Sequence, residues 1–472
     1  MRSTPLGPEC RDGSARAGRH GVRRARYAFG LKYVIVIADG AGDLPIAELG
    51  GKTPLQAAAT PTMDGLARSG RLATARTTPA GWAAGSDVCT MCLLGYDPVR
   101  YHTGRAPLEA AASGVQAGAS DWIFRLNLVT VGPDDAGSPD SGLMLDHSAG
   151  AISDAEAAAI VPDLLAHWRR DVPELAERLT LRHGVSYRSI LVDASGRRFD
   201  GVVCTPPHEV PRQPWAAHLP RAARDDRDDA EAAEFLRELM LSAREFLPGH
   251  AVNVARRAKG LREANMAWIW GQGTKPDMPS FESRFGLRGA MLTPVDLLRG
   301  IAALIGWDRL EPPGMTSYHD NDYAAQGRWA CDAIDRYDIV CCHVESPDES
   351  SHQGDWRTKV AGIEAIDREV VAPIVAKLRS LSPRVGRGTG ANAGADAGWR
   401  LMILPDHYTL VSTRKHDATP VPVLLAGQGF AAPRPALAYA EAEAAASDLH
   451  IAHGHELMEF FLRHALPDPR RG

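Results

Sequence analysis

Carboxylate and imidazole side chains follow three apolar runs of this sequence. Asp39 follows the run at 32–38, Asp348 and His352 follow the run at 338–344, and Asp406, His407 and His416 follow the run at 400–404. Each alone has an ordinary explanation, as a turn residue, a helix-surface pair or a solvated loop residue. Together, at the ends of successive strands, they predict a metal site, because the carboxyl ends of parallel strands meet at one edge of a sheet. Six such ligands are too many for one four-coordinate ion and predict two.

The ligand types narrow the choice of ion. Mixed carboxylate and imidazole ligands favour Mn²⁺ or Zn²⁺ over Ca²⁺, and Co²⁺ is compatible with them as well. We expect two divalent ions per chain.

Ser86 lies in the small-residue turn AGSDV, directly before a segment of helical composition. A serine there can present its hydroxyl at a helix N-terminus, where backbone N–H groups favour anions. The alternative is an ordinary N-cap serine. A hydroxyl becomes a competent nucleophile when a base or metal lowers its pKa, and two metals would also neutralise a transferring phosphoryl group. We therefore predict phosphoryl transfer through Ser86.

The elements that would position these residues alternate between strand and helix. The run at 32–38 is a β-branched strand pattern typical of burial on both faces, and Thr60-Pro61 opens a helical pattern that stops at Gly70. Further strands are expected at 338–344, 400–404 and 420–426, with a helix at 360–378 that Pro373 would kink. This order predicts an α/β fold, a mostly parallel sheet flanked by helices.

The chain divides into three parts. Residues 1–30 are arginine-rich, and this composition predicts a disordered extension. A further hypothesis is that translation starts at Leu31. Residues 31–100 and 281–472 predict a discontinuous metal-binding core, with a flexible surface insertion at 384–398. Residues 101–280 predict an inserted smaller α/β domain that binds substrate, with a helix near 225–247 and a Trp-rich strand at 266–270.

Composition excludes several classes of protein. A net charge of −5 over 472 residues argues against a broad nucleic-acid-binding face. No apolar stretch is long enough to predict a membrane span. Seven cysteines, with an adjacent pair at Cys341 and Cys342, indicate a reduced cytoplasmic protein. Cys89 and Cys92 have metal or redox spacing, but helix packing is the favoured interpretation.

Four segments carry a family resemblance: IADGAGDLPIAELGGKTPLQAAATPTMDGLA, GSDVCTMCLLGYDPVRYHTGRAPLEAA, ESPDESSHQGD and LPDHYTLVSTRKHDATPVPVLLAG. In this order they resemble the archaeal-type cofactor-independent phosphoglycerate mutases, isomerases of glycolysis and gluconeogenesis in the alkaline phosphatase superfamily. The resemblance runs from Leu31 to the C-terminus and implies an alkaline-phosphatase-like core.

The resemblance also implies roles for residues. Ser86 would accept the phosphoryl group of 3-phosphoglycerate and return it to the 2-hydroxyl of the reoriented glycerate. One metal would be held by Asp348, His352 and His416, and the other by Asp39, Ser86, Asp406 and His407. Arginines in similar stretches would bind this small anionic substrate, namely Arg105, Arg125, Arg188 and Arg257, with Arg256 as the alternative to the last.

Two departures affect the expected acceptor of the phosphoryl group. Thr90 replaces the histidine of the archaeal pattern GSDTAH, and Gln326 stands where a lysine is expected. Some bacterial members of the family are proposed homoserine kinases, so a phosphotransferase acting on another acceptor through Ser86 is the alternative. The sequence assigns neither the oligomeric state nor the general base for the substrate hydroxyl.

Overall fold

The computed structural model describes residues 31–132, 142–381, 398–431 and 435–464. The predicted N-terminal extension and all but the last residue of the predicted insertion at 384–398 lie outside this part of the chain. None of the described helices is long and apolar enough to cross a membrane.

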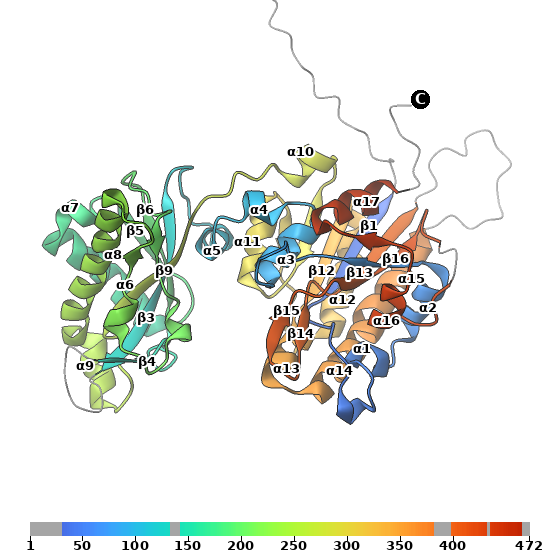
Figure 1. The fold of residues 1–472 in the computed structure, drawn as a ribbon, viewed down its shortest axis with the longest axis horizontal. Helices are drawn as coiled ribbons and strands as arrows, with labels where there is room; N and C mark the ends of the chain where they lie inside the picture. The colour runs from blue at the N-terminus through green and yellow to red at the C-terminus, as the bar shows by residue number, and fades with distance from the viewer. Residues whose placement is uncertain (1–30, 133–141, 382–397, 432–434, 465–472) are drawn as a thin grey trace, which may run out of the picture.

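The predicted α/β architecture is confirmed by an eight-stranded sheet (Figure 1). The central strands β12, β1 and β13 run parallel, and β16 runs antiparallel to both of its neighbours. Ala38 pairs with Val344, and Ile37 pairs with Leu404, so these three central strands end at the same level. In spatial order the strands are β11 (Asp308–Leu310), β10 (Gly289–Leu292), β12 (Ile339–Val344), β1 (Lys32–Ala38), β13 (Trp399–Leu404), β16 (Val421–Gly427), β2 (Arg71–Ala75) and β17 (His450–Ile451).

Helices cover both faces of this sheet because β1 is apolar on both sides. Tyr33 and Ile35 pack toward α3, α11 and α17, whereas Val34 and Val36 pack toward α2, α12, α14 and α15. These helices are α2 (Pro61–Ser69), α3 (Ser86–Leu93), α11 (Asp296–Leu304), α12 (Tyr323–Arg336), α14 (Trp356–Ala365), α15 (Ala372–Leu381) and α17 (Leu457–Arg463).

The helix predicted at 360–378 is interrupted. A π-helical segment, Ile366–Val371, joins α14 to α15, and Pro373 is the second residue of α15. Proline has no N–H to donate to the preceding turn, and a π-helical turn accommodates such a break.

This segment also caps α2. Thr60 makes no side-chain capping bond, and the Asp367 carboxylate instead accepts hydrogen bonds from the backbone N–H groups of Thr62 (3.1 Å) and Met63 (2.8 Å). The boundaries of α2 follow the sequence pattern, whereas its cap comes from a residue about 300 positions away.

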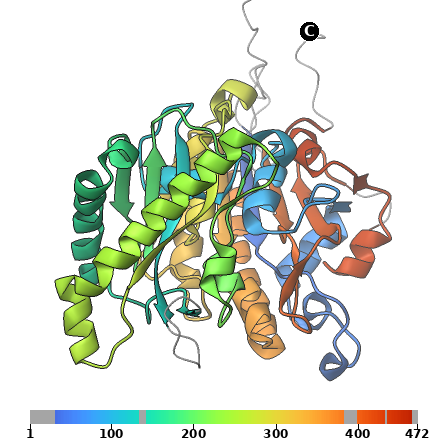
Figure 2. The ribbon, with the colours of Figure 1, turned by 60° about the vertical axis from the view of Figure 1, so that its left-hand side comes forward.

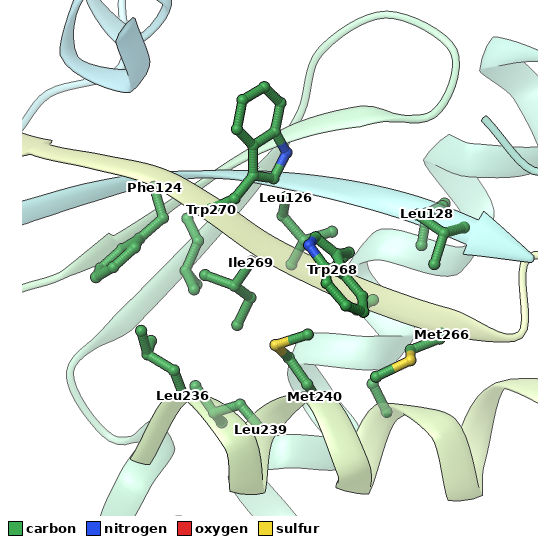
Figure 3. Close-up of a cluster of buried hydrophobic side chains, with 14 of the residues drawn as sticks. Phe124, Leu126, Leu128, Leu236, Leu239, Met240, Met266, Trp268, Ile269 and Trp270 are labelled. Carbon is green, nitrogen blue, oxygen red and sulfur yellow. The ribbon is translucent and has the colours of Figure 1, made fainter. Parts of the chain in front are cut away.

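A second, antiparallel sheet forms a separate layer (Figures 1 and 2). Its core includes side chains of α6 (Asp154–Asp171) and α8 (Arg227–Phe246), and Figure 3 shows Leu236, Leu239 and Met240 of α8 packed below Ile269. Its strands are β3 (Trp122–Gly132), β4 (Leu143–Asp146), β5 (Leu179–His183), β6 (Arg188–Asp193) and β9 (Met266–Thr274). The boundaries predicted for the inserted domain stay a prediction, and this sheet lies within them.

Helix α5 (Arg105–Ala112) connects the two layers. Leu108 belongs to the core of the first sheet, whereas Ala106 and Ala110 pack against Ile123 and Ile190 of the second. Arg125 and Arg188 lie on the same face of the second sheet as Ile190, because they occupy positions that pair with it or lie two residues from it. That face is therefore turned toward α5 and the first sheet.

Candidate active site

The aligned ends of β1, β12 and β13 place the predicted metal ligands together. Asp39 directly follows β1, and α13 (Ser346–Gln353) carries Asp348 and His352. Asp406 and His407 follow β13, and His416 lies on β15 (Lys415–Asp417), paired with β14 (Tyr408–Leu410). Gly40 permits the close approach of β1 to α13, since its φ is +62° and a Cβ there would lie 2.7 Å from Asp348 Oδ1.

The first group of ligands is compact. His352 Nε2 lies 3.1 Å from Asp348 Oδ2 and 2.9 Å from His416 Nε2, and His416 Nε2 lies 3.5 Å from Asp348 Oδ1. The i, i+4 spacing of Asp348 and His352 thus brings both side chains to one point, as the sequence predicted.

The second group lies beside it and is fully buried apart from Ser86. His407 Nε2 is 3.6 Å from Asp39 Oδ1, 3.3 Å from Asp406 Oδ2 and 3.2 Å from Ser86 Oγ. Asp39 Oδ1 and Asp406 Oδ2 have no hydrogen-bond partner among the described residues. Burying a carboxylate oxygen without a hydrogen-bond donor costs folding free energy, and a bound cation would offset that cost. These ligand atoms therefore fit a cation.

The three histidines of these groups share one orientation. The Nδ1–H of His352 donates to the Arg414 carbonyl (2.9 Å), and that of His416 donates to the Ala84 carbonyl (3.2 Å). His407 Nδ1 lies 3.2 Å from Thr409 Oγ1, whose own hydrogen goes to Asp348, so His407 is the donor. In each ring Nδ1 is the donor to a protein oxygen and Nε2 points into the site, where it can bind a metal once it carries no proton.

Burial and charge interactions shift the pKa values of several of these side chains. Although burial opposes it, hydrogen bonds from His352 and His416 hold the pKa of Asp348 well below its usual range. The hydrogen bond with Asp348 raises the pKa of His352 to about 9. Burial, reinforced by the charge of Asp39, raises the pKa of Asp406 to about 7. Clustered shifts of this kind are typical of functional sites.

Ser86 is the first residue of α3, beside this cluster. The next residue, Asp87, accepts hydrogen bonds from Arg105 (3.1 and 3.3 Å) and lies 2.9 Å from His102 Nε2. Asp87 thereby holds the Arg105 guanidinium near the serine. Nothing in the sequence predicted this contact, although Asp87 stands inside the same GSD motif.

Arg125 and Arg188 lie near Arg105. The Arg125 guanidinium pairs with Glu109 (2.9 Å) and lies 4.1 Å from the ring centre of Trp270. Burial lowers the pKa of Arg125, and the charges of Arg105 and Arg188 lower it further, which reflects how close the three cations are. In Figure 3 the Trp270 ring points away from α8.

Arg257 lies elsewhere. It is on α9 (Ala251–Ala258), half exposed and paired with Glu263, and Figure 1 shows α9 well separated from α5. The alternative, Arg256, is buried and pairs with Glu156. The structure thus brings three of the four predicted arginines together and leaves Arg257 apart from them.

A cavity of about 650 Å³ opens beside the predicted metal ligands. Its lining comes from both layers: Trp82, His352, Lys415 and His416 from the first, and His208 from the second. The His208 ring contacts Trp270 at 5.3 Å, so the cavity adjoins the arginine-bearing face of the second sheet. Sequence reasoning missed Trp82, His208 and Lys415, because single residues in loops carry no periodic signal.

The two departures from the family pattern are both buried. Thr90 is inside α3, and its hydroxyl has no partner among the described residues. The Gln326 amide donates to the His343 carbonyl (2.7 Å) and accepts from Asn321 (3.0 Å). Both ends of the Gln326 amide therefore have partners, and one of them is β12.

Comparison with known proteins decides the family. A relative from Methanothermobacter thermautotrophicus, named 2,3-bisphosphoglycerate-independent phosphoglycerate mutase 2, is 40% identical over 432 residues, covering 92% of this chain and 97% of the relative. The chain belongs to the 2,3-bisphosphoglycerate-independent phosphoglycerate mutase family. The family model of that description matches residues 67–253, and a relative of the same family name from Methanothrix thermoacetophila is 41% identical over 84% of this chain and 91% of its own length.

Solved structures share the fold. A protein of Pyrococcus horikoshii matches with a TM-score of 0.70 and 27% identity, covering 92% of this chain and 97% of its own. A cofactor-independent phosphoglycerate mutase of Thermoplasma acidophilum has the same fold, with a TM-score of 0.60, 23% identity and coverage of 92% and 99%. The predicted family and the predicted enzyme class, an isomerase of the phosphoglycerate mutase family, are confirmed.

Proposed function

We propose that this enzyme interconverts 3-phosphoglycerate and 2-phosphoglycerate through a phosphoserine at Ser86, without 2,3-bisphosphoglycerate, as a cytoplasmic step of glycolysis and gluconeogenesis. The observation that carries the proposal is the position of Ser86 Oγ at the start of α3, 3.2 Å from His407 Nε2. His407 in turn faces Asp39 Oδ1 and Asp406 Oδ2, which lack a hydrogen-bond partner in the part of the chain that the structure describes.

The ligands form two sets. Asp348, His352 and His416 would hold one divalent ion, and Asp39, Asp406, His407 and Ser86 would hold the other, with Mn²⁺ as the first choice and Zn²⁺ or Co²⁺ as alternatives. When bound, two such ions supply a lowered pKa for the serine hydroxyl and positive charge against the transferring phosphoryl group. His407 lies between the sets, since its Nε2 faces Asp39 and its ring stacks on His416 at 4.0 Å.

The chain's own residues account for the remaining steps. Ser86 Oγ attacks phosphorus as the bond to the 3-oxygen of the substrate breaks, and the serine proton is transferred to that oxygen. The glycerate reorients in the cavity, and its 2-oxygen then attacks phosphoserine, which releases Ser86 and returns the proton. Arg105, Arg125 and Arg188 would hold the carboxylate and phosphate, since guanidinium groups bind both bidentately.

A coupled assay tests the reaction. Purified enzyme with Mn²⁺ and 3-phosphoglycerate should feed enolase and yield phosphoenolpyruvate without added bisphosphoglycerate. The competing acceptor suggested by Thr90 and Gln326 is homoserine. ATP-dependent phosphorylation of homoserine, with no turnover of 3-phosphoglycerate, would overturn the mutase assignment.

A variant tests the intermediate. Ser86→Ala should abolish turnover while two ions remain bound in a folded protein, because it removes the nucleophile. Ser380→Ala, on the exposed end of α15, is the control and should retain wild-type turnover. Mass spectrometry of acid-quenched wild-type enzyme should find phosphate on Ser86, and substantial turnover by Ser86→Ala would contradict the proposal.

A further inference from the structure

His343 is a buried histidine beside the second ligand set to which the sequence analysis assigned no role. It lies on β12 in register with Ile37 of β1, and its side chain is fully buried. Its Nε2 lies 2.7 Å from Asp39 Oδ2, and its Nδ1 lies 3.0 Å from Thr293 Oγ1.

The Thr293 hydroxyl determines which ring nitrogen of His343 carries hydrogen. Thr293 Oγ1 accepts a hydrogen bond from the backbone N–H of Val295 (3.1 Å). Among the described residues, His343 Nδ1 is the one acceptor within hydrogen-bond distance of the Thr293 hydroxyl. Thr293 therefore donates to Nδ1, and the Nε2–H of His343 donates to Asp39.

This orientation is opposite to that of His352, His407 and His416. Their Nδ1–H groups donate to oxygens and leave Nε2 free to bind a metal. His343 Nε2 carries hydrogen instead, so His343 acts as a donor to a ligand and is not itself a ligand. His343 Nε2 also lies 3.4 Å from Glu345 Oε2, which places the imidazole between two carboxylates.

The hydrogen bond from His343 affects the two oxygens of Asp39 differently. Its Oδ2 is engaged by His343, whereas its Oδ1 has no partner among the described residues and faces His407. We propose that His343, oriented by Thr293, is a positioning residue that reserves Asp39 Oδ1 for the second metal ion. The inference rests on the proposed two-metal site and adds a supporting pair, Thr293 and His343, to it.

Metal binding provides the test, because it needs no substrate. Metal-free protein is titrated with Mn²⁺ by calorimetry and electron paramagnetic resonance, in the wild type and in His343→Leu. Loss of such a supporting hydrogen bond weakens metal binding by roughly 10- to 100-fold. We expect that loss for one ion only, with the affinity of the other ion changed by less than about twofold.

If His343→Leu fails to fold, two variants of Thr293 test the same hydrogen bond with a smaller change of side chain. Thr293→Val should weaken the same ion by a smaller factor, and Thr293→Ser, which keeps the hydroxyl, should restore wild-type affinity. Double variants identify which ion is weakened. His343→Leu should have no further effect on metal binding when it is combined with Asp39→Ala. It should have its full effect when it is combined with His352→Ala.

Several results would overturn the inference: unchanged affinity for both ions, equal loss at both, or a wild-type stoichiometry of three that falls to two in His343→Leu. The last result would make His343 a ligand of an additional ion with Asp39 and Glu345. A wild type that binds fewer than two ions would refute the two-metal proposal and this inference together. Absent mutase activity with the expected binding pattern would refute only the substrate assignment.

Discussion

Metal binding by Asp348, His352 and His416 should weaken steeply as the pH falls. Without metal, the Asp348 carboxylate 3.1 Å from His352 raises the pKa of that imidazole to about 9. A protonated imidazole has no lone pair for a metal, so an ion must displace the proton. The contribution of His352 to metal binding is therefore complete above its raised pKa and is lost progressively as the pH falls below it.

The magnitude follows from that pKa. At pH 7 only about 1% of His352 is neutral, so the apparent Mn²⁺ affinity should be about 100-fold below its limiting value at high pH. Between pH 6 and 8 it should change about tenfold per pH unit for each proton displaced. Burial lowers the pKa of His416, but Asp348 outweighs it and raises the pKa overall, so His416 makes the same contribution in the same direction.

Calorimetric titration at pH 6, 7 and 8 measures the affinity, and repetition at pH 7 in buffers of different ionisation enthalpy counts the protons released. At least one proton per ion should be released at this site. His352→Gln removes the titrating ring, so its weaker binding should depend less on pH. An affinity that stays constant from pH 6 to 8, or binding without proton release, would refute this reasoning.

Two further pairs of substitutions, each a test variant with its control, test the support of the site and its binding of substrate. Lys359 is fully buried and donates to Asp43 Oδ2 (2.8 Å) and to two backbone carbonyls. In urea denaturation, Lys359→Met should therefore reduce the free energy of unfolding by about 3–5 kcal/mol. Lys377→Met, at a more exposed ion pair, is the control and should reduce it by about 0–1 kcal/mol. A loss for Lys359→Met as small as that of the control would contradict this. Arg125→Met should raise KM for 3-phosphoglycerate at least tenfold in the enolase-coupled assay, whereas Arg257→Met should leave it within about twofold. A larger effect at Arg257 would show that the second sheet binds substrate at its far end.

The ligand groups could be predicted because they depend on local sequence and one general rule. Each group follows an apolar run, and parallel strands bring such segments to the same edge of a sheet. The i, i+4 spacing of Asp348 and His352 similarly needs only the geometry of one helical turn. Which of the predicted arginines lie together could not be predicted in this way, because nothing local distinguishes Arg257 on α9 from Arg125 on β3.

Contacts between distant segments could not be predicted in this way. Asp367 caps α2 in place of Thr60, and Lys359 neutralises Asp43 across 316 positions of sequence. His343 appears in the sequence only as a polar residue within an apolar strand. Its role depends on Asp39 of the neighbouring strand and on Thr293, which follows β10.

The sequence by itself therefore determined the α/β fold, the family and the grouping of Ser86 with carboxylates and imidazoles at the strand ends, because hydrophobic periodicity and short motifs encode these features locally. The tertiary structure alone decided which ring nitrogens face the site, which carboxylate oxygens lack a partner, and which arginines gather opposite Ser86. These properties depend on hydrogen bonds between segments hundreds of residues apart, and such hydrogen bonds exist only once the sheet has brought the segments together.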